Sequence, residues 1–393
     1  MKGPFSVDSS SNFSLSTIQK VNHFQSTHES YKKTPLVRLA NLANYLGVED
    51  IFVKDESHRF GLNAFKVLGG IYAIGRYLAE KLRRDIETLS FDELKSPEVR
   101  AILDEITFIT ATDGNHGRGI AWAARAFGYK AIVYMPKGSS IHRLEAIRRE
   151  GAEAEITDYN YDDTVRMAAD RAKENGWVLI QDTAWQGYED IPLWIMQGYA
   201  TLAKETIEQM EEYTNKPPTH LFLQAGVGSF ASAIAAYFAQ YYREHHPKII
   251  VVEPQKADCF YQSFAAADHS PRTVNGEMNT IMAGLACGEP SSIAWEILKH
   301  LCEASFSCDD AVSALGMRVL GNPLKNDERV VSGESGAVTA GLLYCLAKVD
   351  DLKNCKEQIG LDENSSIVLI STEGDTDEEN YRKVVWEGAY PSL

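Results

Sequence analysis

Short apolar runs alternate with longer segments of helical periodicity along most of the chain. The first run, 51–54, precedes a segment in which Val67, Ile71, Ile74 and Leu78 recur at helical spacing. Later strand-like runs lie at 107–110, 131–135, 154–156, 178–180, 221–223, 249–252 and 366–370, and helical patterns lie at 119–127, 141–150, 161–174, 231–242 and 338–346. This alternation predicts an α/β fold with mostly parallel, twisted sheets covered by helices.

Lys66 lies where the first run passes into the first helix. The strand 51–54 ends in the polar cluster 55–59, and Lys66 then falls in the first turn of the apolar-faced helix. In open α/β sheets ligands bind beyond the carboxyl ends of strands. A lysine buried there is expected to have a lowered pKa and to act as a nucleophile that forms Schiff bases. The alternative is a lysine whose stem lies on the surface with its amine in water.

A glycine turn follows the strand 221–223 and opens the helix 231–242. Its central residues are Gly226, Val227, Gly228 and Ser229. Glycines let the backbone approach an anion closely, and a helix N-terminus offers free amides. The turn therefore predicts a phosphate cradle, although a tight turn without a ligand fits a lone G-x-G equally well.

Acidic and amide side chains follow two other strands. Asp113 and Asn115 come after the strand 107–110, and Asp182 comes after 178–180, so the two carboxylates are expected to face one cleft. Helix capping and turn formation are the alternatives for all three. His116 is interpreted as a packing or hydrogen-bonding residue without a catalytic role.

The composition of the chain limits the classes of partner that the protein is expected to bind. The 393 residues carry a formal net charge of -16, which argues against nucleic acid and anionic membranes and for a soluble protein. The polar segment Met1–Ser16 is expected to be a loose arm. Six widely spaced cysteines without a C-x-x-C pair indicate reduced thiols in a cytoplasmic protein, and no metal site is predicted.

Taken in order, the motifs resemble those of the fold-type II pyridoxal-phosphate enzymes, which include threonine and serine dehydratases and the tryptophan synthase β chain. The resemblance spans about Thr34 to Asp377. Its motifs are Thr34-Pro35-Leu36, Val53-Lys54-Asp55-Glu56, Ala64-Phe65-Lys66, Gly114-Asn115-His116-Gly117, Met135-Pro136, Gly151-Ala152-Glu153, the Gly226 turn and Ser335-Gly336-Ala337.

Within this family the details are similar to those of the diaminopropionate ammonia-lyases. Asp113 stands where the dehydratases typically carry a serine that grips the substrate carboxylate. The segments that carry the subgroup resemblance are Phe60 to Lys66, Asp182 to Tyr188, Met196 to Tyr199, Met282 to Leu285 and Gly321 to Leu324.

The resemblance implies a role for each candidate residue. Lys66 would carry pyridoxal 5'-phosphate and act as a base at Cα, and Thr372 would face the ring nitrogen without keeping it protonated. Asn115 would contact the ring 3-oxygen, and Gly226 to Ser229 would hold the phosphate. Asp113 and Asp182 would recognise a second substrate ammonium.

The implied reaction is α,β-elimination of D- and L-2,3-diaminopropionate to pyruvate and two ammonia, with Lys66 serving one enantiomer and Asp113 the other. The resemblance also implies a homodimer, a large cofactor-binding domain (1–85 and 190–393) and a small domain (86–189). Serine/threonine dehydratase is the alternative activity. A non-catalytic cofactor-binding protein, and a nicotinamide-dependent dehydrogenase using Glu253, are more distant alternatives.

Overall fold

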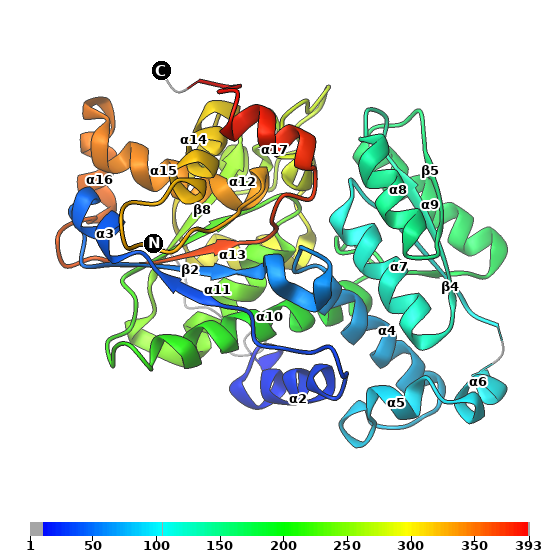
Figure 1. Cartoon of the computed structure of the whole chain (residues 1–393). Helices are drawn as coiled ribbons and strands as arrows, with labels where there is room; N and C mark the ends of the chain where they lie inside the picture. Colours follow the sequence, from blue (N-terminus) through cyan, green and yellow to red (C-terminus); the bar gives the residue numbers. More distant parts are fainter. Residues whose placement is uncertain (1–10, 104, 392–393) are drawn as a thin grey trace.

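The computed structural model describes residues 11–103 and 105–391, which form two lobes, each built on one sheet (Figure 1). The larger sheet has the order β1-β2-β10-β7-β8-β9 and is parallel except for β1. Its strands are β1 (Leu36–Arg38), β2 (Asp50–Asp55), β7 (His220–Gln224), β8 (Lys248–Pro254), β9 (Cys302–Cys308) and β10 (Ser366–Ser371). The smaller sheet is parallel throughout, in the order β5-β4-β3-β6. Its strands are β3 (Thr107–Ala111), β4 (Lys130–Met135), β5 (Glu153–Ile156) and β6 (Val178–Leu179).

Helices cover both sheets, as the alternating pattern predicts. Around the smaller sheet lie α7 (Asn115–Phe127), α8 (Ile141–Arg149) and α9 (Tyr161–Asn175), with α5 (Phe91–Leu94) and α6 (Pro97–Leu103) beside them. The others are α2 (Leu15–Ser26), α3 (Ala40–Leu46), α4 (Val67–Lys81), α10 (Asp190–Met210), α11 (Ser229–Tyr242), α12 (Cys259–Ala265), α13 (Ser292–Leu301), α14 (Asp310–Gly321), α15 (Glu334–Lys348), α16 (Lys353–Ile359) and α17 (Glu378–Val385). Short 3₁₀ turns include η1 (Glu56–Gly61).

The four central strands of the larger sheet, β2, β10, β7 and β8, are buried on both faces. Along β8, Ile249 and Val251 belong to one hydrophobic core, whereas Ile250 and Val252 belong to a second core on the opposite face. A strand buried on both faces appears in the sequence as a continuous apolar run, because it has no solvated face to alternate with. The fold class expected from the sequence is therefore confirmed.

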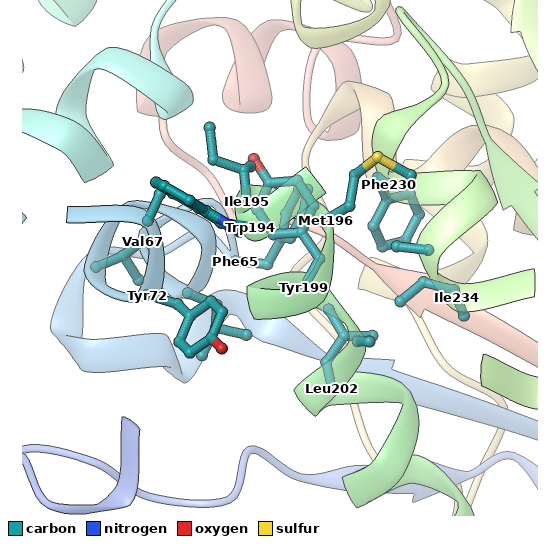
Figure 2. Packing of buried hydrophobic residues seen from close by; sticks show 14 of the residues in the cluster. Phe65, Val67, Tyr72, Trp194, Ile195, Met196, Tyr199, Leu202, Phe230 and Ile234 are labelled. Carbon is teal, nitrogen blue, oxygen red and sulfur yellow. The ribbon is translucent and has the colours of Figure 1, made fainter. Parts of the chain in front are cut away.

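Close helix packing fixes the start of α4, the helix that follows Lys66. Figure 2 shows Phe65 beside Tyr199 of α10 and Phe230 of α11, and the ring centroids of these two pairs are 4.7 and 4.8 Å apart. On α7, a Cβ at Gly119 would lie 2.9 Å from the backbone nitrogen of Val67. Glycine thus allows α7 to contact the backbone next to Lys66 directly.

Three details differ from the sequence expectations. Strands β1 and β9 were not predicted, because β1 has only three residues and Cys302–Cys308 contains no apolar run. The region Lys81–Arg100, expected only as a charged stretch, includes α5 and part of α6. The expected N-terminal arm lies partly outside the described residues, at 1–10. Its remainder is not loose, because Phe13 is buried and α2 begins at Leu15.

None of the helices in the described part of the chain is long and apolar enough to cross a membrane. Strands β3 to β6 fall within 86–189, the range expected for the small domain. The exact division at residues 85/86 and 189/190 stays a prediction.

Candidate active site

Lys66 is held at the junction of β2, η1 and α4. It directly precedes Val67, the first residue of α4, as the sequence predicts. The preceding residues pair with the segment that follows β10: Ala64 forms a bridge with Glu373, and the Phe65 N–H donates to the Thr372 carbonyl at 3.1 Å. A segment near the N-terminal end of the chain and one near its C-terminal end are thereby paired beside the lysine.

The Lys66 amine forms an ion pair with Asp182, which follows β6. Lys66 Nζ donates to Asp182 Oδ2 at 2.6 Å, and the Tyr199 hydroxyl donates to the same oxygen at 3.4 Å. The Ser229 hydroxyl donates to the Asp182 backbone carbonyl. Asp182 is therefore neither a helix cap nor a plain turn residue, but a buried carboxylate facing the lysine.

The pKa values around this pair differ from the simple expectation for a buried lysine. Burial alone would lower the pKa of Lys66, but the Asp182 and Asp113 carboxylates outweigh burial, and the pKa is raised. The expectation of a lowered pKa is thus wrong for Lys66 in this structure. Burial opposes ionisation of Asp182, yet His116 and Lys66 hold its pKa at about 2. Asp182 therefore stays charged at neutral pH.

His116 is buried beside Asp182 and forms a hydrogen bond, which agrees with its interpretation as a packing or hydrogen-bonding residue. Its Nε2 donates to the Ile180 carbonyl at 2.9 Å, and its Nδ1 lies 3.7 Å from Asp182 Oδ2. The Ile180 carbonyl can only accept, so Nε2 carries a proton. Burial lowers the pKa of His116, whereas the Asp182 carboxylate acts in the opposite direction. No sequence signal distinguished this histidine from a packing residue, because its partners lie more than sixty residues away.

Asp113 and Asn115 lie at the end of β3 and the start of α7, but neither caps that helix. Thr112 performs this function: its Oγ1 accepts the N–H groups of Gly114 and Gly117, each at 2.9 Å. Burial raises the pKa of Asp113, although Lys66 and Arg143 favour its charged form. Both side chains are left to face the cavity, which argues against the capping alternative.

The glycine turn leads from β7 into α11. Gly228 has φ +88°, a conformation that favours glycine, and a Cβ there would lie 2.3 Å from the Phe260 ring. Within the described part of the chain, the N–H groups of Gly226, Val227 and Gly228 donate to no acceptor. These amides and the N-terminus of α11 form a cradle suited to an anion.

All nine predicted site residues line one cavity, in which about 610 Å³, counted with its opening to solvent, is free of protein atoms. They are Lys66, Asp113, Asn115, Asp182, Gly226, Val227, Gly228, Ser229 and Thr372. The structure adds residues to which the sequence gave no role: His116, Tyr161, Gln224, Gly284, Cys287, Ser335 and Glu373. Three of them lie in segments that carry the family resemblance: His116 in Gly114–Gly117, Gly284 in Met282–Leu285, and Ser335 in Ser335-Gly336-Ala337.

Glu253, the residue required by the dehydrogenase alternative, forms hydrogen bonds at the start of α12 instead. Its carboxylate accepts the N–H groups of Phe260 and Tyr261 at 2.9 and 2.6 Å, at the start of α12. Burial raises its pKa to about 8. A buried carboxyl that closes a helix end is not placed to bind a ribose.

Comparison with known proteins agrees with this geometry. The family model described as "Pyridoxal-phosphate dependent enzyme" matches residues 28–372. Diaminopropionate ammonia-lyase of Escherichia coli (strain K12) is 52 % identical over 386 residues, which cover 98 % of this chain and 95 % of that protein. Diaminopropionate ammonia-lyase of Salmonella typhimurium (strain LT2) is 54 % identical over 360 residues, 91 % of this chain and 89 % of the relative. The crystal structure of the Escherichia coli protein in complex with D-serine superposes with a TM-score of 0.91 and 49 % identity, covering 100 % of this chain and 95 % of that one.

Proposed function

This chain belongs to the family of pyridoxal-phosphate-dependent enzymes, and we propose from that premise that it converts 2,3-diaminopropionate and water into pyruvate and two molecules of ammonia. One observation carries the proposal. Two carboxylates, Asp113 and Asp182, share a cavity with Lys66, the only lysine or arginine among its described lining residues. A substrate with a second ammonium group complements this acidic cavity, whereas serine and threonine offer only a neutral hydroxyl there.

The residues present fit the cofactor. Unpaired amides at Gly226 to Gly228 complement a phosphate, and a Cβ at Gly226 would lie 3.1 Å from the Leu285 backbone, so a side chain would compete for this space. We assign Lys66 as the covalent carrier, Asn115 as the contact of the ring 3-oxygen and Thr372 as the contact of the ring nitrogen. The cofactor supplies an electron sink for the negative charge that develops at Cα.

Asp113, Asp182 and Lys66 are assigned different roles toward the substrate. Asp182, whose pKa is about 2, stays anionic and suits electrostatic binding of the β-ammonium group. Asp113, whose pKa burial raises, is the better proton acceptor of the two. Lys66 Nζ would take the Cα proton from one enantiomer, and Asp113 would take it from the other. Both isomers are thus expected as substrates.

The stoichiometry of a single assay tests the proposed reaction. Purified enzyme is incubated with D- and L-diaminopropionate, D- and L-serine and L-threonine, and ammonia, pyruvate and 2-oxobutyrate are measured. We expect two ammonia per pyruvate from diaminopropionate as the preferred reaction. A preference for serine or threonine, with one ammonia per oxoacid, would identify the dehydratase instead.

A substitution at Asp113 tests the division between enantiomers. Asp113→Asn keeps the size of the side chain but removes the proton acceptor, so kcat for the D-isomer should fall by about 10²–10⁴-fold. Turnover of the L-isomer should change much less, because Lys66 remains. Asp163→Asn, on exposed α9, is the matched control and should leave both rates unchanged. Equal losses for both isomers, or undiminished turnover of the D-isomer, would contradict the two-base assignment.

We infer further that the enzyme is a cytoplasmic homodimer. The six cysteines are all free in the structure, which suits a reducing compartment. The dimer follows from the family resemblance and is tested by light scattering of the purified protein, where a mass of 43.7 kDa would indicate a monomer instead. The small amino acid is the expected partner, and the net charge of -16 disfavours nucleic acid and anionic membranes.

A further inference from the structure

The Tyr161 hydroxyl takes part in a hydrogen bond whose direction is fixed by the backbone. Tyr161 opens α9, is 7 % exposed and lines the cavity. Its oxygen accepts from Gln181 Nε2 at 3.0 Å. At the other end of this amide, Gln181 Oε1 accepts the Ala111 N–H at 3.0 Å, and a backbone N–H can only donate. The Gln181 amide therefore cannot be reversed, and its NH₂ group occupies one lone pair of the Tyr161 oxygen.

The proton of the Tyr161 hydroxyl must then point away from Gln181. Among the described residues, Gln181 is the only hydrogen-bond partner of this hydroxyl. Burial, together with the nearby Asp182 and Asp113 carboxylates, raises the pKa of Tyr161 well above its usual range, so the phenol keeps its proton at neutral pH. Buried donors are normally satisfied, and the cavity is the place where a ligand can supply the acceptor.

Few other side chains of the cavity are able to donate to an anion. The Ser229 hydroxyl donates to the Asp182 backbone carbonyl, and both protons of the Gln224 amide are used within the protein. Asp113 stands where the dehydratases typically carry a serine that grips the substrate carboxylate, and an ionised carboxylate has no proton to donate. The hydroxyl of Tyr161 is therefore suited to supply a donor that these positions do not.

Tyr161 packs with residues of the phosphate cradle as well as with its own lobe. It belongs to a buried apolar cluster in which Val227 of the glycine turn and Cys287 are the only fully buried members from outside the range 86–189. A Cβ at Gly226 would lie 3.2 Å from Cys287 Sγ, so this cluster adjoins the cradle directly. The phosphate of the cofactor and the carboxylate of an amino acid are the anionic groups that enter this cavity.

We propose that Tyr161 is a binding residue whose hydroxyl donates to an anionic oxygen of the bound ligand, either the cofactor phosphate or the substrate carboxylate. The carboxylate case rests on the proposed function, whereas the phosphate case rests only on the cofactor of the family. In both cases Tyr161 offsets the repulsion between an anion and the acidic cavity. It does so without adding a cation that would compete with a substrate ammonium group for Asp113 and Asp182.

The substitution Tyr161→Phe removes this hydroxyl and keeps the ring that packs in the cluster. A hydrogen bond to a charged group contributes about 10–100-fold to affinity, and the loss should be confined to ligands that carry the anion. Tyr129→Phe is the matched control in the same lobe. The Tyr129 hydroxyl is buried, has no hydrogen-bond partner in the described part of the chain and does not line the cavity, so every constant should stay unchanged.

Two pairs of ligands distinguish the phosphate from the carboxylate. Cofactor-free enzyme is titrated with pyridoxal phosphate and with pyridoxal, and the dissociation constants are measured by visible absorption. Loaded enzyme gives the KM of the amino acid that the wild type turns over, and the inhibition constant of the amine that lacks its carboxylate. This amine is 1,2-diaminoethane for diaminopropionate and 2-aminoethanol for serine. A loss confined to pyridoxal phosphate assigns the hydroxyl to the phosphate, and a rise confined to KM assigns it to the carboxylate.

The remaining outcomes overturn the inference. Unchanged constants in both pairs, or equal losses for the two members of a pair, would show that Tyr161 has only a structural role, because such a role weakens charged and neutral ligands alike. The proposed function is judged separately, from the wild type. Preferred turnover of serine would contradict the proposed reaction, and the serine pair would still decide the role of Tyr161.

Discussion

At the scale of single residues, the charge state of Lys66 is decided by its neighbours and not by its burial. Burial disfavours an ammonium group, but Asp182 at 2.6 Å and the nearby Asp113 reverse the balance and raise the pKa. The lysine therefore holds its proton in the cofactor-free enzyme. A Schiff base requires the neutral amine, so the ion pair must open before the cofactor can attach.

Replacing Asp182 should make Lys66 reactive at lower pH. In Asp182→Asn the desolvation of the amine is no longer offset by the adjacent carboxylate, and we expect the pKa of Lys66 to fall by about 1–3 pH units. The measurement is acetic anhydride labelling of cofactor-free enzyme over a range of pH, quantified for the Lys66 peptide by mass spectrometry. Only the neutral amine reacts, so the labelling midpoint reports the pKa.

An exposed lysine in the same digests provides the control. Lys216 is paired with Glu49 at the surface, far from the cavity in the sequence and in its contacts, and its midpoint should be identical in both proteins. A Lys66 midpoint that stays in place, or moves upward, would show that Asp182 is not what holds the proton on the lysine.

The sequence was sufficient to locate the residues that carry chemistry by themselves. Asp113 and Thr372 closely follow predicted strands and Lys66 opens the helix after another, and parallel sheets bring such positions together. It was insufficient for residues that act through others. His116, for example, contacts Asp182 and the Ile180 carbonyl, which lie more than sixty positions away in the sequence. The raised pKa of Lys66 was missed for the same reason.

At the scale of elements, a buried ion network holds the turn that leads to Lys66. Arg59 of η1 donates to Glu56 and to Glu205 of α10, and Lys54 of β2 donates to Glu205 at 2.8 Å. All four side chains are at most 1 % exposed. Phe60, which follows Arg59, has φ +49°, a conformation that bulky residues rarely adopt. We infer that the network stabilises this strained turn.

Neutralising Glu205 should destabilise the enzyme strongly. Glu205→Gln leaves Lys54 and Arg59 with one carboxylate between them in a buried site, and we expect the free energy of unfolding to fall by about 3–5 kcal/mol. Burial opposes ionisation of Glu205, but Arg59 and Lys54 hold its pKa at about 2, below the value of about 4.3 in an unfolded chain. This stabilisation is complete above the unfolded pKa and is lost only as the pH falls toward 2.

Urea unfolding at pH 6 and pH 8 measures this effect, and the loss should be the same at both values. The matched control is Glu208→Gln, one turn further along α10, where the carboxylate is 36 % exposed and pairs with Lys33. It should cost no more than about 1 kcal/mol. Similar losses in the two variants would mean that the buried network contributes no more to the free energy of unfolding than the exposed ion pair does.

The sequence patterns identified most strands, because most strands are buried on both faces and form continuous apolar runs. The two missing strands, β1 and β9, are the edges of the larger sheet; β1 has three residues, and the central residues of β9 are only half-buried. A sequence such as Cys-Glu-Ala-Ser-Phe-Ser-Cys carries neither an apolar run nor a clear alternation. The ion network was also not predicted, since Lys54 and Glu205 are 151 positions apart.

At the scale of the whole molecule, the cavity is built from both lobes. Lys66, the glycine turn and Thr372 come from the larger sheet, whereas Asp113, Asn115 and Asp182 follow strands of the smaller one. Three ion pairs also join the lobes: Lys66 with Asp182, Arg143 with Glu334, and Arg166 with Glu289. The Arg166 pair is half-exposed and contributes little, whereas one hydrophobic core extends through both lobes. A cofactor bound in the cavity would add a further connection between them.

Loading with pyridoxal phosphate should therefore protect both lobes at once. A ligand that binds only the folded state stabilises that state by about 2.7 kcal/mol when its free concentration is 100 times its dissociation constant. Hydrogen exchange followed by mass spectrometry should show slower exchange at 113–117 and 182–186 in the smaller lobe, together with 226–230 and 370–375 in the larger one. Helix α16 (Lys353–Ile359) contributes no residue to the cavity and should exchange at the same rate in both states. Protection of the larger lobe alone would show that the cofactor does not connect the lobes, and that the carboxylates of the smaller one meet it only when substrate arrives.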